Sequence, residues 1–255
     1  MPDLSLEEEL TKSGEARVAG IDEAGRGPLA GPVAAAAVIL PADYENEHLD
    51  DSKKLTEGRR ELLYEELITD ESVCWALSFA GVEEIEEINI LRATHLAMAR
   101  AVAGLRHKPS FCLIDGLDVP GFPLASRGVV KGDGISLSIA AASIIAKVSR
   151  DRCMRRFAEE FPEYGFERHK GYGTAAHAEA LESYAGGAVK FLKLLDGGIT
   201  DNFGTTGLAV ARARAETPYA PLTPAQAVTL KRALLLVADA GVRRDLAWTQ
   251  RLRGP

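Results

Sequence analysis

The sequence lacks the signals that mark membrane, secreted or thiolate-metal proteins. No apolar run approaches the roughly 20 residues needed to cross a bilayer. The acidic start MPDLSLEEEL has neither the basic end nor the apolar stretch of a secretory signal. The cysteines, Cys74, Cys112 and Cys153, are odd in number and have no metal-ligand spacing. We therefore expect a cytoplasmic protein with reduced, mostly buried thiols and no membrane partner.

Several common catalytic motifs are absent as well. The stretch GRGPLAG lacks the Lys-Ser/Thr pair of a phosphate-binding P-loop, and GDGISLS lacks the spacing of a dinucleotide fingerprint. Neither the Gly-x-Ser-x-Gly elbow of a serine hydrolase nor a His-Glu-x-x-His zinc motif occurs. The chemistry must therefore be sought in other residues.

Acidic residues outnumber basic ones, but the two are unevenly distributed. The formal net charge is −7; residues 43–90 hold 15 acids against 4 bases, and residues 186–255 hold 10 bases against 5 acids. Nucleic-acid binding requires a local basic face rather than a basic total. The charge balance therefore leaves a polyanionic partner open without favouring one.

What the sequence does contain is a series of short apolar segments that give way to amphipathic ones. RVAGID and PVAAAAVIL, joined by a glycine-rich connection, predict a β-hairpin. Residues 1–15 predict a frayed end or one short helix, and Thr56 is the expected N-cap of a later helix. Further strands are predicted within residues 72–82, 110–117 and 127–134, and helices within residues 51–68, 83–105, 136–161 and 169–184. Antiparallel strands followed by strands that alternate with helices predict an α/β domain with a mixed sheet.

Four acids lie where apolar strands end, each beside glycine or another acid. Asp22 and Glu23 follow VAGI, Asp115 follows FCLI, and Asp133 follows VVKG. Ligand sites in open α/β sheets form outside the strand ends, so neighbouring strands would bring these carboxyl groups together. Two like charges about 4 Å apart repel by roughly 4 kcal/mol at an effective dielectric near 20, so such a cluster needs protons or a cation. Oxygen ligands without nearby His or Cys favour Mg²⁺ or Mn²⁺.

Each of these acids also has a purely structural interpretation. A single Asp-Gly pair at a strand end is usually only a turn, which is the commoner role for Asp115 or Asp133 taken alone. A turn does not require two consecutive acids after an apolar strand, so this interpretation is weaker for Asp22 and Glu23.

Two glycine-framed loops suggest ligand recognition. In GRG, Gly25 and Gly27 would allow close backbone approach, and Arg26 adds a fork of donors that suits a ribose hydroxyl or a phosphate. In HKGYG, the ring of Tyr172 can stack on a sugar or base, although packing is the commoner role of a loop tyrosine.

Taken together, these stretches resemble ribonuclease HII, the type 2 ribonuclease H of bacteria. The similarity covers about residues 16–184 and is carried by AGIDEAGRGPLAGPVAAAAVIL, DSKKLTEGRRELLYEEL, EEIEEINILRATHLAMARAVAGL, LIDG, VVKGDGISLSIAAASIIAKVSRDR and YGFERHKGYGT. The resemblance implies the ribonuclease H-like α/β fold, with a central mixed sheet flanked by helices. It also implies endonucleolytic cleavage of the RNA strand in RNA–DNA hybrids and at ribonucleotides embedded in duplex DNA, leaving 5′-phosphate and 3′-hydroxyl ends.

The resemblance further assigns roles to the candidate acids. The catalytic acids of the family correspond to Asp22, Glu23, Asp115 and Asp133. They would hold two divalent ions, Mg²⁺ or Mn²⁺, roughly 4 Å apart at the scissile phosphate. Asp22 is the expected bridging ligand.

In the family, the loop that corresponds to Gly25, Arg26 and Gly27 senses the 2′-hydroxyl. The tyrosine that corresponds to Tyr172 packs on the next sugar, where a deoxyribose fits, which implies a preference for an RNA-to-DNA junction.

Three further residues lie in the matching segments. Lys53 and Lys54 in DSKKL are candidate phosphate contacts, with a solvated role as the alternative. Asp151 in SRDR is interpreted as a structural acid that pairs with nearby arginines.

The chain departs from the family pattern after Tyr184. Family members usually close with a helix and a short motif resembling HRRSF, which helps to hold the nucleic acid, whereas GGAVKFLKLLDGGITDNFG stands here. We predict a polar segment in residues 1–15, a catalytic domain in residues 16–184, and a diverged, partly helical extension in residues 185–255.

The leading hypothesis is a monomeric, metal-dependent endoribonuclease that acts on RNA–DNA hybrids or on DNA duplexes containing ribonucleotides. One alternative is a non-catalytic hybrid-binding protein on the same fold. Another is a ribonuclease H-like nuclease that acts on branched or single-stranded DNA.

Overall fold

The computed structural model describes residues 2–50 and 52–184, so the predicted C-terminal extension lies outside the described residues. The predicted alternation of strands and helices is present. In chain order the elements are α1 Ser5–Lys12, β1 Val18–Ala24, β2 Val33–Ile39, α2 Glu57–Thr69, β3 Cys74–Ala80, α3 Val82–Gly104, β4 Phe111–Asp115, β5 Ser126–Val129, the 3₁₀ turn η1 Gly132–Gly134, α4 Leu137–Glu160, the 3₁₀ turn η2 Pro162–Tyr164, α5 Phe166–His169 and α6 Ala175–Tyr184.

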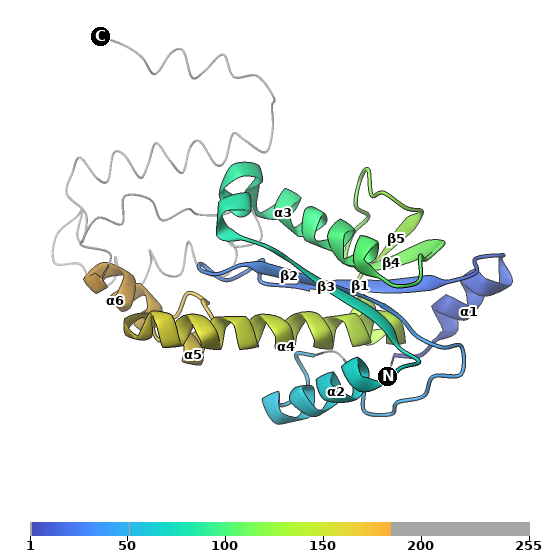
Figure 1. The fold of residues 1–255 in the computed structure, drawn as a ribbon, viewed down its shortest axis with the longest axis horizontal. Helices are drawn as coiled ribbons and strands as arrows, with labels where there is room; N and C mark the ends of the chain where they lie inside the picture. Colours follow the sequence, from blue (N-terminus) through green and yellow to red (C-terminus); the bar gives the residue numbers. More distant parts are fainter. Residues whose placement is uncertain (1, 51, 185–255) are drawn as a thin grey trace, which may run out of the picture. The chain divides into compact units, whose positions relative to one another are not determined.

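Five strands form one mixed sheet in the order β3-β2-β1-β4-β5 (Figure 1). Strands β1, β2 and β3 pair antiparallel, which confirms the predicted hairpin, whereas β4 runs parallel to β1 and β5 runs parallel to β4. In this register Ile21 pairs with Ile114. The next residues along the two parallel strands, Asp22 and Asp115, are therefore neighbours at the same end of the sheet.

The alanine-rich strand β2 allows helices to pack closely on both faces of the sheet. Alternate side chains of a strand point to opposite faces. Ala35 and Ala37 belong to the core cluster that includes α3, whereas Ala36 and Val38 belong to the cluster that includes α2 and α4. Figure 1 shows α3 on one side of the sheet and α2 and α4 on the other. The predicted mixed sheet flanked by helices is confirmed.

Helix α4 crosses the sheet so closely that one position of β1 has no room for a side chain. A Cβ atom added at Gly20 would overlap backbone atoms of Ser138 and Ile139. The helix begins after Ser136, whose hydroxyl accepts a hydrogen bond from the Ile139 amide at 3.2 Å. The first turn of α4 thus lies directly against the strand that carries Asp22.

The N-terminal segment forms the short helix α1, which docks on the same turn of α4. Oε1 of the buried Glu7 accepts hydrogen bonds from the hydroxyls of Ser136 and Ser138, each at 2.5 Å. The Leu137 amide donates to the Asp3 carbonyl at 2.8 Å. Of the two predicted possibilities for residues 1–15, the helix is therefore right, and its docking site was not predicted.

Helix α3 contains a kink that the sequence pattern did not predict. Asn89 has φ 67° and ψ 165°, a conformation that is rare outside glycine. Its side-chain oxygen accepts a hydrogen bond from the Arg92 amide at 3.1 Å, so Asn89 caps the second part of the helix. Among the described helices, none has the length and apolar character of a membrane span.

Candidate metal centre and recognition loops

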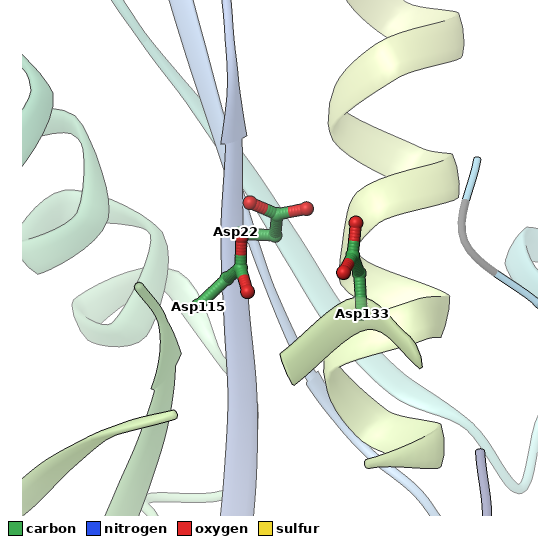
Figure 2. Close-up of side chains that lie close together, drawn as sticks. All are labelled: Asp22, Asp115 and Asp133. Atoms are coloured by element: carbon green, nitrogen blue, oxygen red, sulfur yellow. The ribbon is translucent and has the colours of Figure 1, made fainter. Parts of the chain in front are cut away.

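Three of the four strand-end acids converge. Asp22 lies near the end of β1, Asp115 ends β4, and Asp133 lies in η1, between β5 and α4. One carboxylate oxygen from each of the three lies within 4.8 Å of the others, an arrangement that can hold a metal ion (Figure 2). Parallel pairing of β1 with β4 accounts for the first two positions, and the turn after β5 brings in the third.

Backbone amides and one lysine orient these carboxylates. The Glu23 amide donates to Asp22 Oδ1 at 2.7 Å, and the Gly132 amide donates to Asp115 Oδ1 at 2.6 Å. Lys53 Nζ donates to Asp133 Oδ2 at 3.2 Å. The predicted phosphate contact Lys53 thus lies at the edge of the acid cluster.

The turn that carries Asp133 depends on one unusual backbone conformation and on one position without room for a side chain. Lys131 has φ 58°, in the left-handed region, which reverses the chain after β5. At Gly132 an added Cβ atom would lie 2.6 Å from Ile139 Cδ1 and 3.3 Å from Asp115 Oδ1. The small residue beside Asp133 therefore lets the turn pack against both α4 and the neighbouring acid.

The electrostatics of the cluster favour a bound cation. Burial, followed by the charges of Glu23 and Asp115, raises the pKa of Asp22 well above its usual value. Asp133 is 4% exposed and Asp22 is 6% exposed, so water screens their charges poorly. Carboxylate oxygens in such a site fit a hard divalent ion, which would offset the mutual repulsion.

Glu23 stands apart from the other three acids. It is not a member of the group of three oxygens that lie within 4.8 Å of one another in the described residues. Its Oε1 accepts a hydrogen bond from Arg26 Nη1 at 3.2 Å. Burial raises the pKa of Glu23, Arg26 offsets part of that shift, and Asp115 adds to it. Its predicted place among the metal ligands stays a prediction.

The two glycine-framed loops lie side by side, although about 145 residues separate them in the sequence. A Cβ atom added at Gly27 would lie 3.6 Å from Cε1 of Tyr172. The amides of Leu29 and Ala30 both donate to the carbonyl of Gly171, at 2.8 and 3.3 Å. The GRG loop and the HKGYG loop therefore form one surface.

Tyr172 is 41% exposed at this surface. Lys147 Nζ lies 5.8 Å from the centre of its ring, and the same atom donates to Asp151 Oδ1 at 2.8 Å. Asp151 was predicted to pair with nearby arginines. Its hydrogen bond is instead with the lysine one helical turn earlier, and among the arginines its charge acts on Arg150, where it offsets part of the lowering of the pKa that burial causes. Lys147 was missed, although its i,i+4 spacing to Asp151 was a readable signal. Lys54 pairs with Asp50 at 2.9 Å on the surface.

Comparisons with known proteins agree with these features. Residues 19–192 match the family model described as Ribonuclease HII. A ribonuclease HII of Delftia acidovorans is 50% identical over 221 residues, which cover 87% of this chain and 90% of the relative. One of Chlamydia muridarum is 52% identical over 179 residues, which cover 70% of this chain and 82% of the relative. The match to the Delftia protein spans more residues than lie between Met1 and Tyr184. It therefore extends into residues 185–255, the region that we predicted to be diverged.

Solved structures are similar in fold and in sequence. The ribonuclease H2 of Pyrococcus horikoshii has a TM-score of 0.57 and 30% identity, with 66% of this chain and 86% of that chain covered. The RNase HII of a PCNA complex from Archaeoglobus fulgidus has a TM-score of 0.56 and 31% identity, with 66% of this chain and 88% of that chain covered.

Proposed function

The chain belongs to the ribonuclease HII family and is a type 2 ribonuclease H, and from this premise we propose that its catalytic centre is the cluster of Asp22, Asp115 and Asp133. The substrate would be the RNA strand of an RNA–DNA hybrid or a ribonucleotide embedded in duplex DNA, cut on its 5′ side. The observation that carries the proposal is the convergence of three carboxylates from three separate segments on the end of one sheet (Figure 2).

The acids would hold divalent ions, Mg²⁺ or Mn²⁺, with Asp22 as the shared ligand and Glu23 as a further one. Divalent ions held there would supply activation of the attacking water and stabilisation of the leaving 3′ oxygen, a chemistry that gives 5′-phosphate and 3′-hydroxyl ends. The chain itself keeps the carboxylates oriented through the amides of Glu23 and Gly132. Lys53, which pairs with Asp133 and whose side chain is 77% exposed, would contact substrate phosphate at the rim.

Substrate choice would reside in the joined loops. Gly25, Arg26 and Gly27 would sense the 2′-hydroxyl of the ribonucleotide, and the exposed ring of Tyr172 would pack on the next sugar. The closeness of Gly27 to the ring of Tyr172 supports this proposal, because both groups must read adjacent nucleotides at the same time.

A cleavage assay tests the catalytic proposal. The protein is incubated with Mg²⁺ or Mn²⁺ and a DNA duplex that carries one ribonucleotide, and nicks on its 5′ side are counted. We expect nicking by the wild type and by the control Asp43→Asn, which changes an exposed loop acid, but not by Asp22→Asn. Binding of the duplex without a nick in either metal would instead support a hybrid-binding protein, and cleavage of an all-DNA substrate would support a different nuclease.

A further inference from the structure

Arg150 is a charged side chain in the interior of the protein. It lies in α4 and is 1% exposed. Burial lowers the pKa of its guanidinium, which nevertheless stays charged because arginine titrates far above neutral pH. A buried charge is costly unless hydrogen bonds compensate it, so the partners of Arg150 show what it stabilises.

Three backbone carbonyls accept hydrogen bonds from this one guanidinium. Nε donates to the Pro32 carbonyl at 2.9 Å, Nη2 to the Ala30 carbonyl at 3.0 Å, and Nη1 to the Lys170 carbonyl at 3.0 Å. Ala30 and Pro32 lie in the connection that begins with GRG, and Lys170 lies in the HKGYG loop. The planar fork of one arginine therefore ties both loops to α4.

Glycines let the loops lie close to this fork and to α4. A Cβ atom at Gly25 would overlap Arg150 Nε, whereas one at Gly31 would overlap Sδ of Met154, one turn after Arg150 on α4. A Cβ atom at Gly171 would overlap the carbonyl oxygen of Ala30, one of the three acceptors. All three glycines have positive φ, at 111°, 93° and 85°. The two loops thus fit closely against each other and against Arg150 and Met154 of α4, and a side chain at any of these glycines would disturb that fit.

The geometry points to Arg150 as a positioning residue that sets substrate choice by fixing the separation of Gly27 and Tyr172. This inference rests on the proposed function, in which the two loops read adjacent nucleotides. Arg150 reaches the substrate only through backbone carbonyls, and the acids Asp22 and Asp115 are held by strand pairing and by other hydrogen bonds. Loosening the loops should therefore alter selection of the RNA-to-DNA junction more than it alters the chemical step.

The test compares kcat/KM on two substrates, a DNA duplex with a single ribonucleotide and a long RNA–DNA hybrid. Arg150→Lys keeps the charge but cannot reach three carbonyls with one planar fork. We expect kcat/KM to fall at least about tenfold on the single ribonucleotide and less than about threefold on the hybrid. The substrate ratio is kcat/KM on the single ribonucleotide divided by kcat/KM on the hybrid. General destabilisation reduces the amount of active enzyme, so it would lower both values equally and leave this ratio unchanged. An unchanged substrate ratio would overturn the inference.

Arg152→Lys is the matched control. Arg152 lies two residues further along α4, and its Nη2 bonds to Glu61 at 2.5 Å and to Glu65 at 2.7 Å, which are residues of α2 and not of the loops. The same substitution there should leave the substrate ratio within about twofold of wild type. A shift equal to that of Arg150→Lys would show that the effect is not specific to the loop contacts and would overturn the inference.

Two further variants separate this inference from the proposed function. If Arg150 acts through Tyr172, Arg150→Lys should change the ratio no further in a Tyr172→Ala background. An unchanged substrate ratio in Tyr172→Ala alone would refute the proposed reading of the junction. If Tyr172→Ala changes the substrate ratio and Arg150→Lys does not, only the role of Arg150 is refuted.

Should Arg150→Lys not fold, Gly171→Ala pushes the same loops apart and should lower the substrate ratio in the same direction. No change in that ratio would overturn the inference.

Discussion

The first half of α4, residues 137–146, and its second half, residues 147–160, organise the site by different means. The first half lies against β1 through direct backbone contact at Gly20, next to the turn that carries Asp133. The second half holds the two loops through the hydrogen bonds of one side chain, Arg150. The acids are therefore placed by close packing with no tolerance for added atoms, whereas the loops depend on contacts that a substitution can weaken by degrees.

This difference predicts which changes stop the reaction and which alter its selectivity. A metal centre fails when one ligand moves or disappears, because every substrate needs it. The GRG loop itself would sense the 2′-hydroxyl, which both substrates carry. The position of Tyr172 relative to that loop matters for substrates that contain a junction, because Tyr172 would read the deoxyribose that follows the ribonucleotide. The first half of α4 should therefore govern activity and stability, and the second half should govern preference.

The largest effect is expected at the acid cluster. Asp133→Asn removes a charge from the group of three carboxylates and should lower kcat/KM at least about 10³-fold, or about 4 kcal/mol, on both substrates. The reason is that the amide is a weaker ligand for a divalent ion than a carboxylate. Cleavage rates on the single-ribonucleotide duplex and the long hybrid check this. A loss of cleavage on only one of the two substrates would contradict the idea that the acids serve every substrate.

Gly20→Ala should produce the next largest effect, on stability. Its Cβ atom would overlap backbone of Ser138, which cannot move aside like a flexible side chain, so we expect a loss of about 3 kcal/mol in the free energy of unfolding. Gly58→Ala is the matched control, because Gly58 lies in the first turn of α2 with no atom within 4 Å of an added Cβ, and should stabilise by up to about 1 kcal/mol. Denaturant unfolding measures both. Equal stabilities of the two variants would contradict the close packing of α4 on β1.

Glu7→Ala tests how far the N-terminal helix supports the first turn of α4. The carboxylate of Glu7 accepts from Ser136 and Ser138, so its removal should cost about 2 kcal/mol. Glu8→Ala, which removes an exposed pair with Lys12, should cost less than about 0.5 kcal/mol. Chemical denaturation of both variants provides the comparison. If Glu7→Ala lowers the free energy of unfolding as little as Glu8→Ala does, α1 contributes little to the stability of the first turn of α4.

The smallest expected effects concern the pH dependence of stability. They have opposite signs at the acid cluster and at the HKGYG loop. Burial, then Glu23 and Asp115, raises the pKa of Asp22 above its ordinary 3.8, so without metal its contribution to stability decreases as the pH rises above 3.8. At the loop end, His177 is fully buried and its Nδ1 bonds to the Tyr172 carbonyl at 2.9 Å. Burial lowers the pKa of His177 below 6.5, so its contribution is present above pH 6.5 and is lost as the pH falls below that value.

Unfolding free energies measured without divalent ions at several pH values check both signs. Relative to wild type, Asp22→Asn should gain stability as the pH rises, and His177→Asn should gain stability as the pH falls, each by no more than about 1 kcal/mol per pH unit. Parallel pH profiles for wild type and both variants would contradict the opposite responses of the two ends.

The sequence was a good guide to everything that depends on local pattern. Thr56 caps α2 as predicted, with its hydroxyl accepting from the Arg59 amide at 3.3 Å. The acids of VAGIDE and FCLID could be paired in advance, because parallel strands place their carboxyl ends at one edge of a sheet. The same logic could not separate Glu23 from the others, since its pairing with Arg26 depends on how the GRG loop turns.

What the sequence determined by itself is the set of strands and helices, the acids at the strand ends and the two glycine-framed loops, because periodicity and turn chemistry act over a few residues. Only the tertiary structure decided that the loops meet and that Gly25 leaves space for Arg150. An arginine in a basic helix carries no local sign of being buried. Its role follows from packing between segments far apart in the chain, which no short stretch of sequence encodes.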